Sequence, residues 1–300
     1  IARVRETVKD FKIERLLGKS LFHLSGGEKQ MIACASICVT APDVMILDEP
    51  SSNLDVRHIS ILAKIIQKWK AQGKTVIISE HRLYYLTHIA DRFVCLAKGK
   101  KVFDLSTDEL RKQDTEKLSA LGLRTPDIRY LEPEPTGVAG KQALCFEKFR
   151  FSYKRQKECL QLENFCVPKN EIIAIIGNNG AAKSTFGRCL CGIEKVGMVR
   201  DGDMPLSYKD RLKQCYMVMQ DVNHQLFTES VMDELLISMK NPDEQQALEI
   251  LAQLGLSEYA KRHPMSLSGG EKQRVAIATA LASDREYVVM DEPTSGLDYK

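Results

Sequence analysis

The heptapeptide LSGGEKQ stands at residues 24–30 and returns unchanged at residues 267–273. The tripeptide DEP at residues 48–50 recurs at residues 291–293, and the pair LD at residues 54–55 recurs at residues 297–298. All three pairs are separated by the same offset (267 − 24 = 243). Several motifs repeated in one register are typical of a duplicated domain. The sequence therefore predicts parts of two domains with the same fold.

The two copies differ in what surrounds these motifs. The first continues beyond DEP through a helix and a strand ending in SEH at residues 79–81, whereas the second is preceded by a long region that starts near residue 143. At the same offset, the counterpart of each flanking region would fall outside residues 1–300. We expect residues 1–112 to be the C-terminal part of a first domain and residues 143–300 the N-terminal part of a second, both truncated. Residues 113–142 carry prolines and glycines typical of a linker.

Composition and charge exclude several classes of protein. With 44% hydrophobic and 28% charged residues, the chain can bury globular cores. No apolar run approaches the ~18 residues of a membrane-spanning helix, so a membrane role would need a partner. A net charge of +3, with the basic residues scattered, does not indicate nucleic-acid binding. Nine cysteines without a CxxC pair of metal-site spacing indicate reduced, buried thiols.

A strand, a glycine loop and a helix follow one another in the second copy. The apolar run EIIAII at residues 171–176 predicts a strand buried on both faces of a parallel sheet. The loop GNNGAAKST then leads into a helix-like FGRCLCGI. Glycines let backbone N–H groups surround phosphate oxygens, and the helix N-terminus favours negative charge. The expected phosphate-binding residues are Gly177, Asn178, Asn179, Gly180, Ala181, Ala182, Lys183, Ser184 and Thr185.

Within this loop, Lys183 is expected to reach the β- and γ-phosphates, and Ser184 to ligate Mg²⁺. The position before Lys183 holds Ala182 instead of the usual glycine. If Ala182 has right-handed helical geometry, its Cβ costs little backbone strain. With alanine at this position, the sequence supports ATP binding by the loop more strongly than ATP hydrolysis.

Each DEP motif follows an apolar run that predicts a buried strand. The first acid of each pair, Asp48 or Asp291, is expected to support Mg²⁺, and the second, Glu49 or Glu292, to act as general base. Two acids that merely cap the next helix are the plainer interpretation. That interpretation does not explain why the pair recurs in a chain with a phosphate loop.

The two LSGGEKQ segments each begin a helix-like stretch. A serine and free glycine amides at a helix N-terminus form an anion site, although a lone SGG would be an ordinary N-cap. The repetition of the segment, with Gly27 and Gly270 each 21 residues before the first acid of the strand-end pair, favours the anion site. Its residues are Ser25, Gly26, Gly27, Ser268, Gly269 and Gly270.

Together these residues closely resemble the ABC ATPase family over nearly the whole chain. LSGGEKQ resembles its signature, GNNGAAKST its Walker A motif, and VMILDEP and YVVMDEP its Walker B motifs. The resemblance implies an α/β fold of two P-loop NTPase domains with mostly parallel sheets and with β-rich and helical subdomains. It also implies further site residues: the A-loop aromatic Tyr153, the Q-loop Gln220 as an Mg²⁺ ligand, the D-loop Asp55 and Asp298, and the switch histidine His81.

In this family two domains pair head to tail around two ATP molecules. The resemblance implies that the second copy's Tyr153, Lys183 and Glu292 face the first copy's Ser25 and Asp55 across one ATP. The other site keeps Glu49 and His81 but lacks its Walker A motif. ATP and Mg²⁺ are therefore the expected cofactors, and residues 1–300 alone are expected to bind ATP poorly and to hydrolyse little.

The stretch after Gln220 resembles one particular subgroup of the ABC ATPase family. Residues 220–235, QDVNHQLFTESVMDEL, look like energy-coupling-factor importer ATPases of the cobalt and vitamin type. This implies docking on integral membrane subunits near residues 220–235 and a cytoplasmic position, peripheral on the inner face of the cell membrane. The plainer interpretation is an ordinary exposed loop with one buried side chain, Phe227.

Three alternatives stay open with less support. An ABC-F-type translation factor acting on ribosomes would join its domains by a long, charged, helical linker, and residues 113–142 are short and broken by proline. A coiled-coil DNA-repair ATPase would insert long heptad repeats between Ser184 and Ser268, where none occurs. The hypothesis of a degenerate nucleotide-binding scaffold is supported by Ala182 only.

Overall fold

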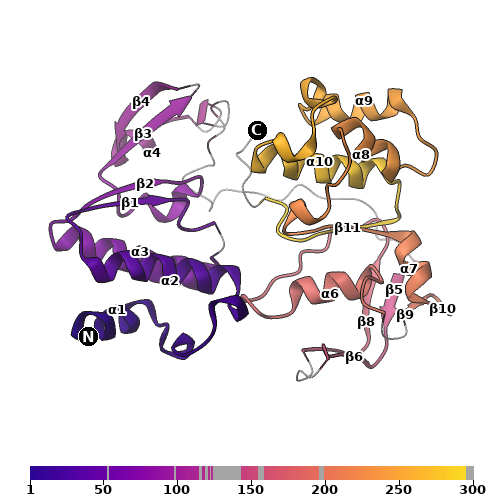
Figure 1. Cartoon of the computed structure of the whole chain (residues 1–300), viewed down its shortest axis with the longest axis horizontal. Helices are drawn as coiled ribbons and strands as arrows, with labels where there is room; N and C mark the ends of the chain where they lie inside the picture. Colours follow the sequence, from indigo (N-terminus) through magenta and orange to yellow (C-terminus); the bar gives the residue numbers. More distant parts are fainter. Residues whose placement is uncertain are drawn as a thin grey trace. The chain divides into compact units, whose positions relative to one another are not determined.

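The computed structural model describes residues 1–52, 54–97, 99–114, 117, 118, 121, 123, 143–154, 159–195 and 199–294. The chain divides into two compact units, one within residues 1–132 and the other within residues 133–297 (Figure 1). Most of the predicted linker at residues 113–142 lies outside the described residues. Among those that are described, none of the helices combines the length and apolar character that crossing a membrane requires.

The first unit has helices on one side of a short parallel strand pair. β1 pairs with β2 in parallel, with Val44 opposite Thr75 and Asp48 opposite Ser79. β3 and β4 form an antiparallel pair beside it. The elements are α1 (Ala2–Phe11), α2 (Gly26–Thr40), β1 (Val44–Asp48), α3 (Val56–Ala71), β2 (Thr75–Ser79), β3 (Arg92–Ala97), β4 (Lys100–Ser106) and α4 (Thr107–Arg111), with 3-10 turns η1 (Glu14–Leu16), η2 (Leu21–His23) and η3 (Leu83–Tyr85).

The core of the first unit lies between α1, α2, α3 and the strand pair. Phe11, Met31 and Leu62 are fully buried there, and Met45 and Leu47 reach it from β1. The alternate residues of β1 point away from this core, which leaves Val44 53% and Ile46 69% exposed. The predicted strand at residues 44–48 is therefore present but buried on one face only, because helices cover that face.

The second unit contains an antiparallel sheet of order β10-β9-β5-β8, a separate β6·β7 pair and a parallel pair of β11 and β12. Its elements are β5 (Ala143–Phe146), β6 (Phe149–Phe151), β7 (Leu160–Leu162), β8 (Phe165–Pro168), α6 (Lys183–Leu190), β9 (Val199–Asp201), β10 (Met204–Leu206), α7 (Tyr208–Gln214), β11 (Cys215–Val218), α8 (Val231–Ser238), α9 (Glu244–Gln253), α10 (Gly269–Ala282) and β12 (Tyr287–Met290), with 3-10 turns η5 (Val222–His224), η6 (Ser257–Tyr259) and η7 (Pro264–Ser266).

Two cores hold this unit together. Phe146, Phe149 and Phe186 pack aromatic edges and faces between the antiparallel sheet and α6. Leu235, Leu251 and other apolar side chains join α8, α9 and α10 into a helical subdomain. The predicted β-rich and helical subdomains are both present.

Serine and aspartate caps fix where the helices begin. Ser25 and Ser268 each form a capping box with the glutamate three residues later, so α2 and α10 start at the same point of the repeat. Asp55 caps α3 by accepting the backbone N–H of His58 at 2.9 Å. Such caps satisfy N–H groups that have no partner inside the helix.

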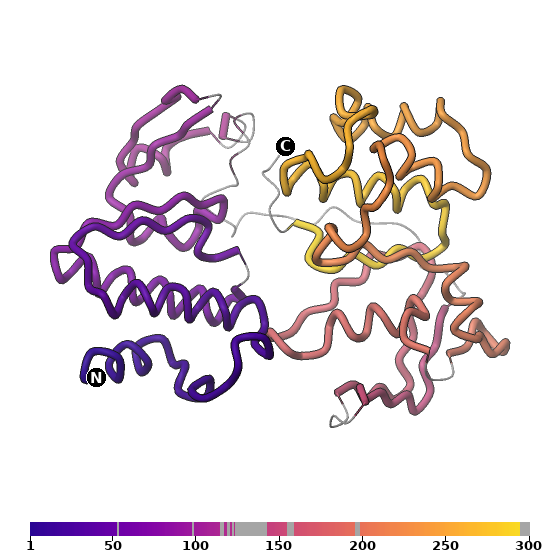
Figure 2. The backbone as a smooth tube through the Cα atoms, viewed as in Figure 1, coloured from indigo at the N-terminus to yellow at the C-terminus, as the bar shows by residue number. Residues whose placement is uncertain are grey.

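The predicted strand at residues 171–176 is not formed. The segment forms neither a helix nor a paired strand, and its apolar side chains are open, with Ile172 84% and Ile176 90% exposed. Its backbone can be followed between β8 and α6 in Figure 2. The prediction of a strand buried on both faces is therefore wrong in the described structure. A strand also needs a neighbour, and in the described structure a cavity of about 690 Å³ lies between this segment and β12.

The cysteine prediction needs a correction as well. Cys145 and Cys166 occupy facing positions of β5 and β8 and are joined by a disulfide. Seven cysteines are free, five of them buried. Burial raises the pKa of Cys34 to about 11 and that of Cys189 to about 12, so these thiols are protonated and unreactive near neutral pH.

Replacing Leu62 by alanine should destabilise the first unit by about 2–5 kcal/mol, because Leu62 is fully buried in its core and the truncation leaves a cavity. The single tryptophan, Trp69, lies in the same helix and core, so its fluorescence during urea unfolding reports on this unit. The matched control is Leu17→Ala, at a residue that is 64% exposed. Equal losses for the two variants would contradict the assigned core.

Candidate nucleotide site

The glycine loop, residues 177–185, turns the extended segment into helix α6. Ala181 N–H donates to the Asn178 carbonyl at 3.1 Å, and Gly180 has φ +80°, a value that only glycine adopts without cost. A Cβ on Gly177 would come within 3.2 Å of the Ala181 Cβ. The Lys183 amine folds back and donates to the carbonyls of Gly177 and Asn178 at 3.0 and 3.1 Å. The loop thus forms a tight backbone turn with a cation beside it.

Ala182 is the N-cap of α6 and has φ +66° and ψ 26°. This is the left-handed region, so the condition under which alanine would cost little backbone strain is not met. An L-residue pays roughly 1–2 kcal/mol there because its Cβ approaches the following carbonyl. Ala182 therefore has a backbone conformation that glycine usually supplies. The consequence of having alanine in place of glycine at this position is backbone strain.

Tyr153 lies at the start of α6. Its hydroxyl is 3.4 Å from the Thr185 hydroxyl, and its ring packs edge to face against Phe151 with centroids 4.8 Å apart. The structure therefore brings the predicted aromatic residue to the glycine loop, 24 residues before Gly177 in the chain. The ring is half-buried, so part of it is still open to a ligand.

The parallel pairing of β11 with β12 brings polar residues to one strand end. Gln220 follows β11, and Asp291 and Glu292 follow β12. Asp291 N–H donates to the Val218 carbonyl at 3.0 Å, and the Gln220 amide donates to the Glu292 carboxylate at 2.9 Å. Asp291 and Glu292 line the same cavity as Lys183 and Ser184. The glycine loop and the strand-end acids therefore share one site.

These residues suit a nucleotide with Mg²⁺. Within the described ranges, no group of three or more His, Cys, Asp or Glu side chains is placed to hold a metal ion alone. Mg²⁺ in phosphate-transfer sites takes only one or two protein oxygens and completes its shell with phosphate and water. A hydroxyl at Ser184, an amide oxygen at Gln220 and a carboxylate at Asp291 meet that demand.

The first unit holds the corresponding acids and adds a histidine. His81 Nε2 lies 3.1 Å from a Glu49 carboxylate oxygen, and the Ser79 hydroxyl donates to Asp48. Glu49 N–H donates to the Ser79 carbonyl at 3.0 Å. Glu49 and Glu292 both have left-handed backbones, with φ 41° and 50°. The two copies thus repeat an unusual conformation at the predicted general base, as active-site residues often do.

Glu80 was missed by sequence reasoning. Its carboxylate accepts from the Tyr85 hydroxyl at 2.9 Å and from the backbone N–H groups of His81 and Arg82 at 2.9 and 3.1 Å. Burial, together with the nearby Glu80 charge, raises the pKa of Tyr85, so this hydroxyl stays a donor. Glu80 therefore fixes the turn that carries His81, and its place directly before the histidine was the available signal.

Arg82 holds the turn after β1. Its guanidinium donates to the carbonyls of Ser51 and Leu54 at 3.1 and 3.3 Å. Asp55, which follows, is engaged with the backbone and ring of His58. Its counterpart Asp298 lies outside the described residues.

The repeated LSGGEKQ segments have equivalent geometry in each unit. The Ser25 hydroxyl accepts from Glu28 N–H at 3.2 Å, and the Ser268 hydroxyl accepts from Glu271 N–H at 3.4 Å. Gly26 and Gly269 are exposed, and a Cβ at Gly269 would meet only open space. Each helix start therefore presents glycine backbone on the surface, as an anion site requires.

Comparison with known proteins agrees with this geometry. The sequence pattern of the ABC transporter family matches residues 1–52 and 160–295, which together are more than half of the chain. The chain belongs to the ABC transporter family of ATP-binding proteins, for which ATPase activity is the expected chemistry.

Three relatives are informative. An ABC transporter ATP-binding protein of Treponema denticola is 41% identical over all of this chain and 63% of its own length, and a second from the same organism is 35% identical. A Bacillus subtilis protein named as an HMP/thiamine import ATP-binding protein, YkoD, is 32% identical over 99% of this chain and 60% of its own length. The chain spans about three fifths of the length of these relatives.

Solved structures also align along the chain. RNase-L Inhibitor aligns with 99% of it at a TM-score of 0.69 and 26% identity, over 58% of the other chain. A second aligned structure is described as ribosome-bound archaeal Pelota and ABCE1. It aligns with all of this chain at a TM-score of 0.71 and 27% identity, over 50% of the other chain.

Replacing Ala182 by glycine should slow amide hydrogen exchange in α6, since it removes a left-handed alanine and stabilises the loop by about 1 kcal/mol. The matched control is Ala181→Gly at the neighbouring position, which has no positive φ. There the same change should destabilise by up to about 1 kcal/mol, because it only frees the unfolded chain. Shifts of the same sign in both variants would contradict the assigned geometry.

Proposed function

We propose that this chain forms part of the ATP-binding and hydrolysing component of an ABC importer of the energy-coupling-factor type. The observation that carries this proposal is the single cavity bordered by Lys183, Ser184, Asp291 and Glu292. A phosphate loop and two strand-end carboxylates in one cavity are what hydrolysis of a phosphoanhydride requires.

Each residue of the site has a role in this proposal. Glycine-loop amides and the N-terminus of α6 bind the phosphates, and Lys183 exchanges its two carbonyl partners for phosphate oxygens. Ser184, Gln220 and Asp291 hold Mg²⁺, which neutralises phosphate charge when bound. Tyr153 stacks on the adenine. Glu292 accepts a proton from the attacking water, and the Gln220 amide orients its carboxylate.

We also propose that the two units are parts of two ABC ATPase domains in tandem. The support is the constant 243-residue offset, the matching caps at Ser25 and Ser268, and the shared left-handed backbone at Glu49 and Glu292. In a head-to-tail pair, Ser25, Gly26 and Gly27 would contact the nucleotide held by Lys183. Ser268, Gly269 and Gly270 would serve the site of Asp48, Glu49 and His81. The tandem protein would then be longer than residues 1–300, as its relatives are.

The loop after Gln220 supports docking to a membrane subunit. Gln225 ties the loop to β11 by donating to the Met217 carbonyl and accepting from Met219 N–H, both at 3.1 Å. Glu234 is buried and accepts from the backbone N–H groups of Phe227 and Thr228.

The loop buries Leu226 and leaves the Phe227 side chain 73% exposed. The interpretation of Phe227 as a buried loop anchor is therefore wrong. A rigidly held, exposed aromatic side chain is an interface feature.

The proposed importer function requires polytopic membrane subunits as partners. Binding to these subunits would hold the protein at the inner face of the cell membrane. The importer interpretation draws on relatives named as transporter ATP-binding proteins, at 32–41% identity for the three above. The transported solute is recognised elsewhere in such systems. The thiamine-import name of one relative therefore only suggests vitamins as a class.

A ribosome-acting ATPase is the second candidate, because an aligned structure is ribosome-bound ABCE1. Its identity of 27% is below that of the transporter relatives. Expression of the intact protein with the membrane proteins encoded beside it, followed by affinity purification, separates the two functions. The importer predicts recovery of an integral membrane subunit. Recovery of ribosomes with no membrane subunit would overturn it.

Replacing Phe227 by serine should abolish recovery of the membrane subunit while changing the free energy of unfolding by no more than about 0.5 kcal/mol, since the side chain is exposed. Met204→Ser is the matched control, at a residue 69% exposed in the antiparallel sheet. Glu234→Ala should also reduce recovery, because two loop amides lose their acceptor. Retained binding by Phe227→Ser would exclude this loop as the docking surface.

Steady-state ATP turnover by residues 1–300 should be slow. In the described part of the second unit, Glu292 is hydrogen-bonded by Gln220, whereas Glu49 in the first unit has His81 at 3.1 Å. A phosphate-release assay with Glu292→Gln as the background control measures this. Fast turnover would contradict this prediction, and fast turnover that Glu292→Gln leaves unchanged would also contradict the assignment of this base.

A further inference from the structure

The disulfide between Cys145 and Cys166 lies on the outer face of the antiparallel sheet. The two cysteines face each other across β5 and β8, and β8 is an edge strand of the described sheet. Their chain neighbours Leu144, Phe146 and Val167 are buried in the core, so the two sulfur atoms lie on the opposite face. Cys166 is exposed and Cys145 is half-buried. The bond is therefore accessible to a thiol in solution.

A guanidinium group faces Cys145 from the other side. Arg200 in β9 pairs with Cys145 in the β5·β9 ladder, and residues that pair in this way lie on the same face of a sheet. Arg200 also forms an ion pair with Glu147, in which Nε lies 3.6 Å from a carboxylate oxygen. A cation beside a cysteine favours its thiolate form. The two sulfur atoms therefore differ, because that of Cys166 is open to attack and that of Cys145 lies on the face that carries Arg200.

The same two strands support the helix that starts at the glycine loop. On their core faces lie Phe146 and Phe165, whose ring centroids are 5.5 and 5.6 Å from that of Phe186 in α6. Phe186 follows Lys183 by three residues, within the first turn of α6. Phe165 directly precedes Cys166 in β8, a strand of four residues. The disulfide thus joins the short strand that packs against the start of α6 to the rest of the sheet.

We propose that Cys145 and Cys166 form a site of reversible thiol–disulfide exchange, which determines how firmly β8 supports α6. Exposed disulfides are the ones that thiols reduce, and in reducing compartments such pairs act as redox sensors. When the bond is open, β8 is held only by its four-residue ladder and its core contacts. This inference goes beyond the proposed importer and requires neither a membrane partner nor a particular solute.

Reduction takes two exchange steps with a dithiol as the reductant. One thiolate of the dithiol attacks the Cys166 sulfur, the bond between the two cysteine sulfurs breaks, and Cys145 leaves as a thiolate on the face that carries Arg200. The second thiolate of the dithiol then attacks its own sulfur in the mixed disulfide and releases the Cys166 thiolate. The two cysteines take up the two protons that the dithiol lost. Two electrons pass to the cysteine pair, and the dithiol becomes a cyclic disulfide.

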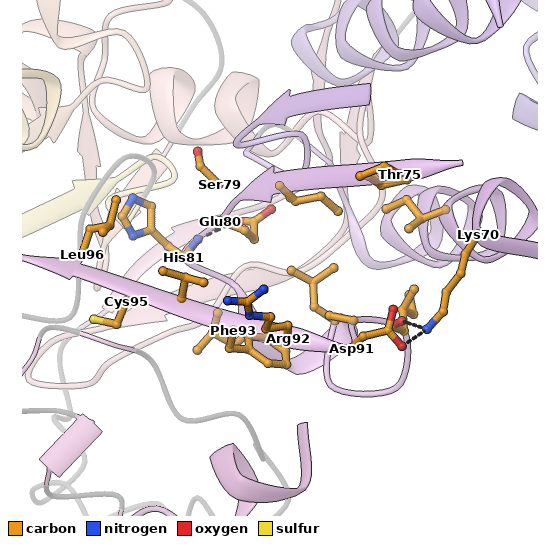
Figure 3. A pocket seen from close by; sticks show the side chains of 18 of the residues that line it. Lys70, Thr75, Ser79, Glu80, His81, Asp91, Arg92, Phe93, Cys95 and Leu96 are labelled. Atoms are coloured by element: carbon orange, nitrogen blue, oxygen red, sulfur yellow. Dashed lines mark hydrogen bonds and ion pairs between the residues drawn. The ribbon is translucent and has the colours of Figure 1, made fainter. Parts of the chain in front are cut away.

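Differential alkylation of the intact protein tests the exchange. The protein is equilibrated with mixtures of reduced and oxidised dithiothreitol and labelled with iodoacetamide, and mass spectrometry identifies the labelled cysteines. Labelling of Cys145 and Cys166 should rise together with the reduced fraction and fall again on oxidation. Cys159, an exposed free thiol, should be labelled throughout. Cys95, seen on β3 in Figure 3, is buried and pairs with Phe103 in its ladder, so it should stay unlabelled.

Two substitutions at the ion pair test which sulfur is attacked. Arg200→Gln should slow reduction by about threefold, because the leaving Cys145 thiolate loses its cation, and Arg200→Lys should restore the rate. Glu147→Gln should accelerate reduction, because it removes the carboxylate that competes for the guanidinium. An ion pair that only stabilised the sheet would change both rates in the same direction. That result would overturn the assigned attack on Cys166.

Amide hydrogen exchange tests the effect on α6. Reduction should speed exchange of the amides from Phe186 to Leu190 by at least about tenfold and leave α9 unchanged. The double variant Cys145→Ser, Cys166→Ser should match the reduced protein and no longer respond to dithiothreitol, whereas the wild-type comparison needs no variant. Labelling that ignores the dithiothreitol ratio, or α6 exchange that reduction leaves unchanged, would overturn the proposal. These measurements use no nucleotide, so their failure would leave the proposed ATPase function standing.

Discussion

The pairing of two strands in parallel is the constraint on which the site depends. Because β11 and β12 run in the same direction, the residues that follow them meet at one edge, and Gln220 comes within 2.9 Å of Glu292. The same geometry in the first unit places Asp48 beside Ser79. The backbone N–H of Asp291 joins the ladder at the Val218 carbonyl, so the acids are held by the main chain itself. A shift of this register would separate the Glu292 carboxylate from the Gln220 amide.

Backbone conformation at three residues follows from this arrangement. Glu49 and Glu292 turn sharply after their strands with positive φ, and Ala182 does the same before α6. Such conformations persist only where the surrounding structure imposes them. The glycine loop tolerates alanine because the helix that it starts is anchored by Phe186 and Leu190 in the aromatic core. The chain therefore accepts local strain at the glycine loop and at both acid pairs, with the paired strands and α6 as support.

Much of this could be predicted from the sequence, for identifiable reasons. The helices α2 and α10 begin where the Ser-Gly-Gly segments predict, because capping is local. β1 ends at the expected Asp48, and β12 ends directly before the expected Asp291. Residues 171–176 were not predictable as unpaired, since pairing depends on a neighbour that hydrophobicity does not reveal. The φ of Ala182, the Cys145–Cys166 pair and the exposure of Phe227 instead of Leu226 are set by tertiary packing and strand register. The role of Glu80 could be recognised only from its hydrogen bonds in the structure.

We propose that the glycine loop and the strand-end acids form one nucleotide site. Equilibrium titration of residues 1–300 with a fluorescent, non-hydrolysable ATP analogue and Mg²⁺ tests it most directly when Lys183→Met is titrated in parallel. A lost charge-assisted contact of about 1.5–3 kcal/mol should weaken binding roughly 10- to 100-fold in the variant. An affinity that Lys183→Met leaves unchanged, with α6 still folded, would contradict the account.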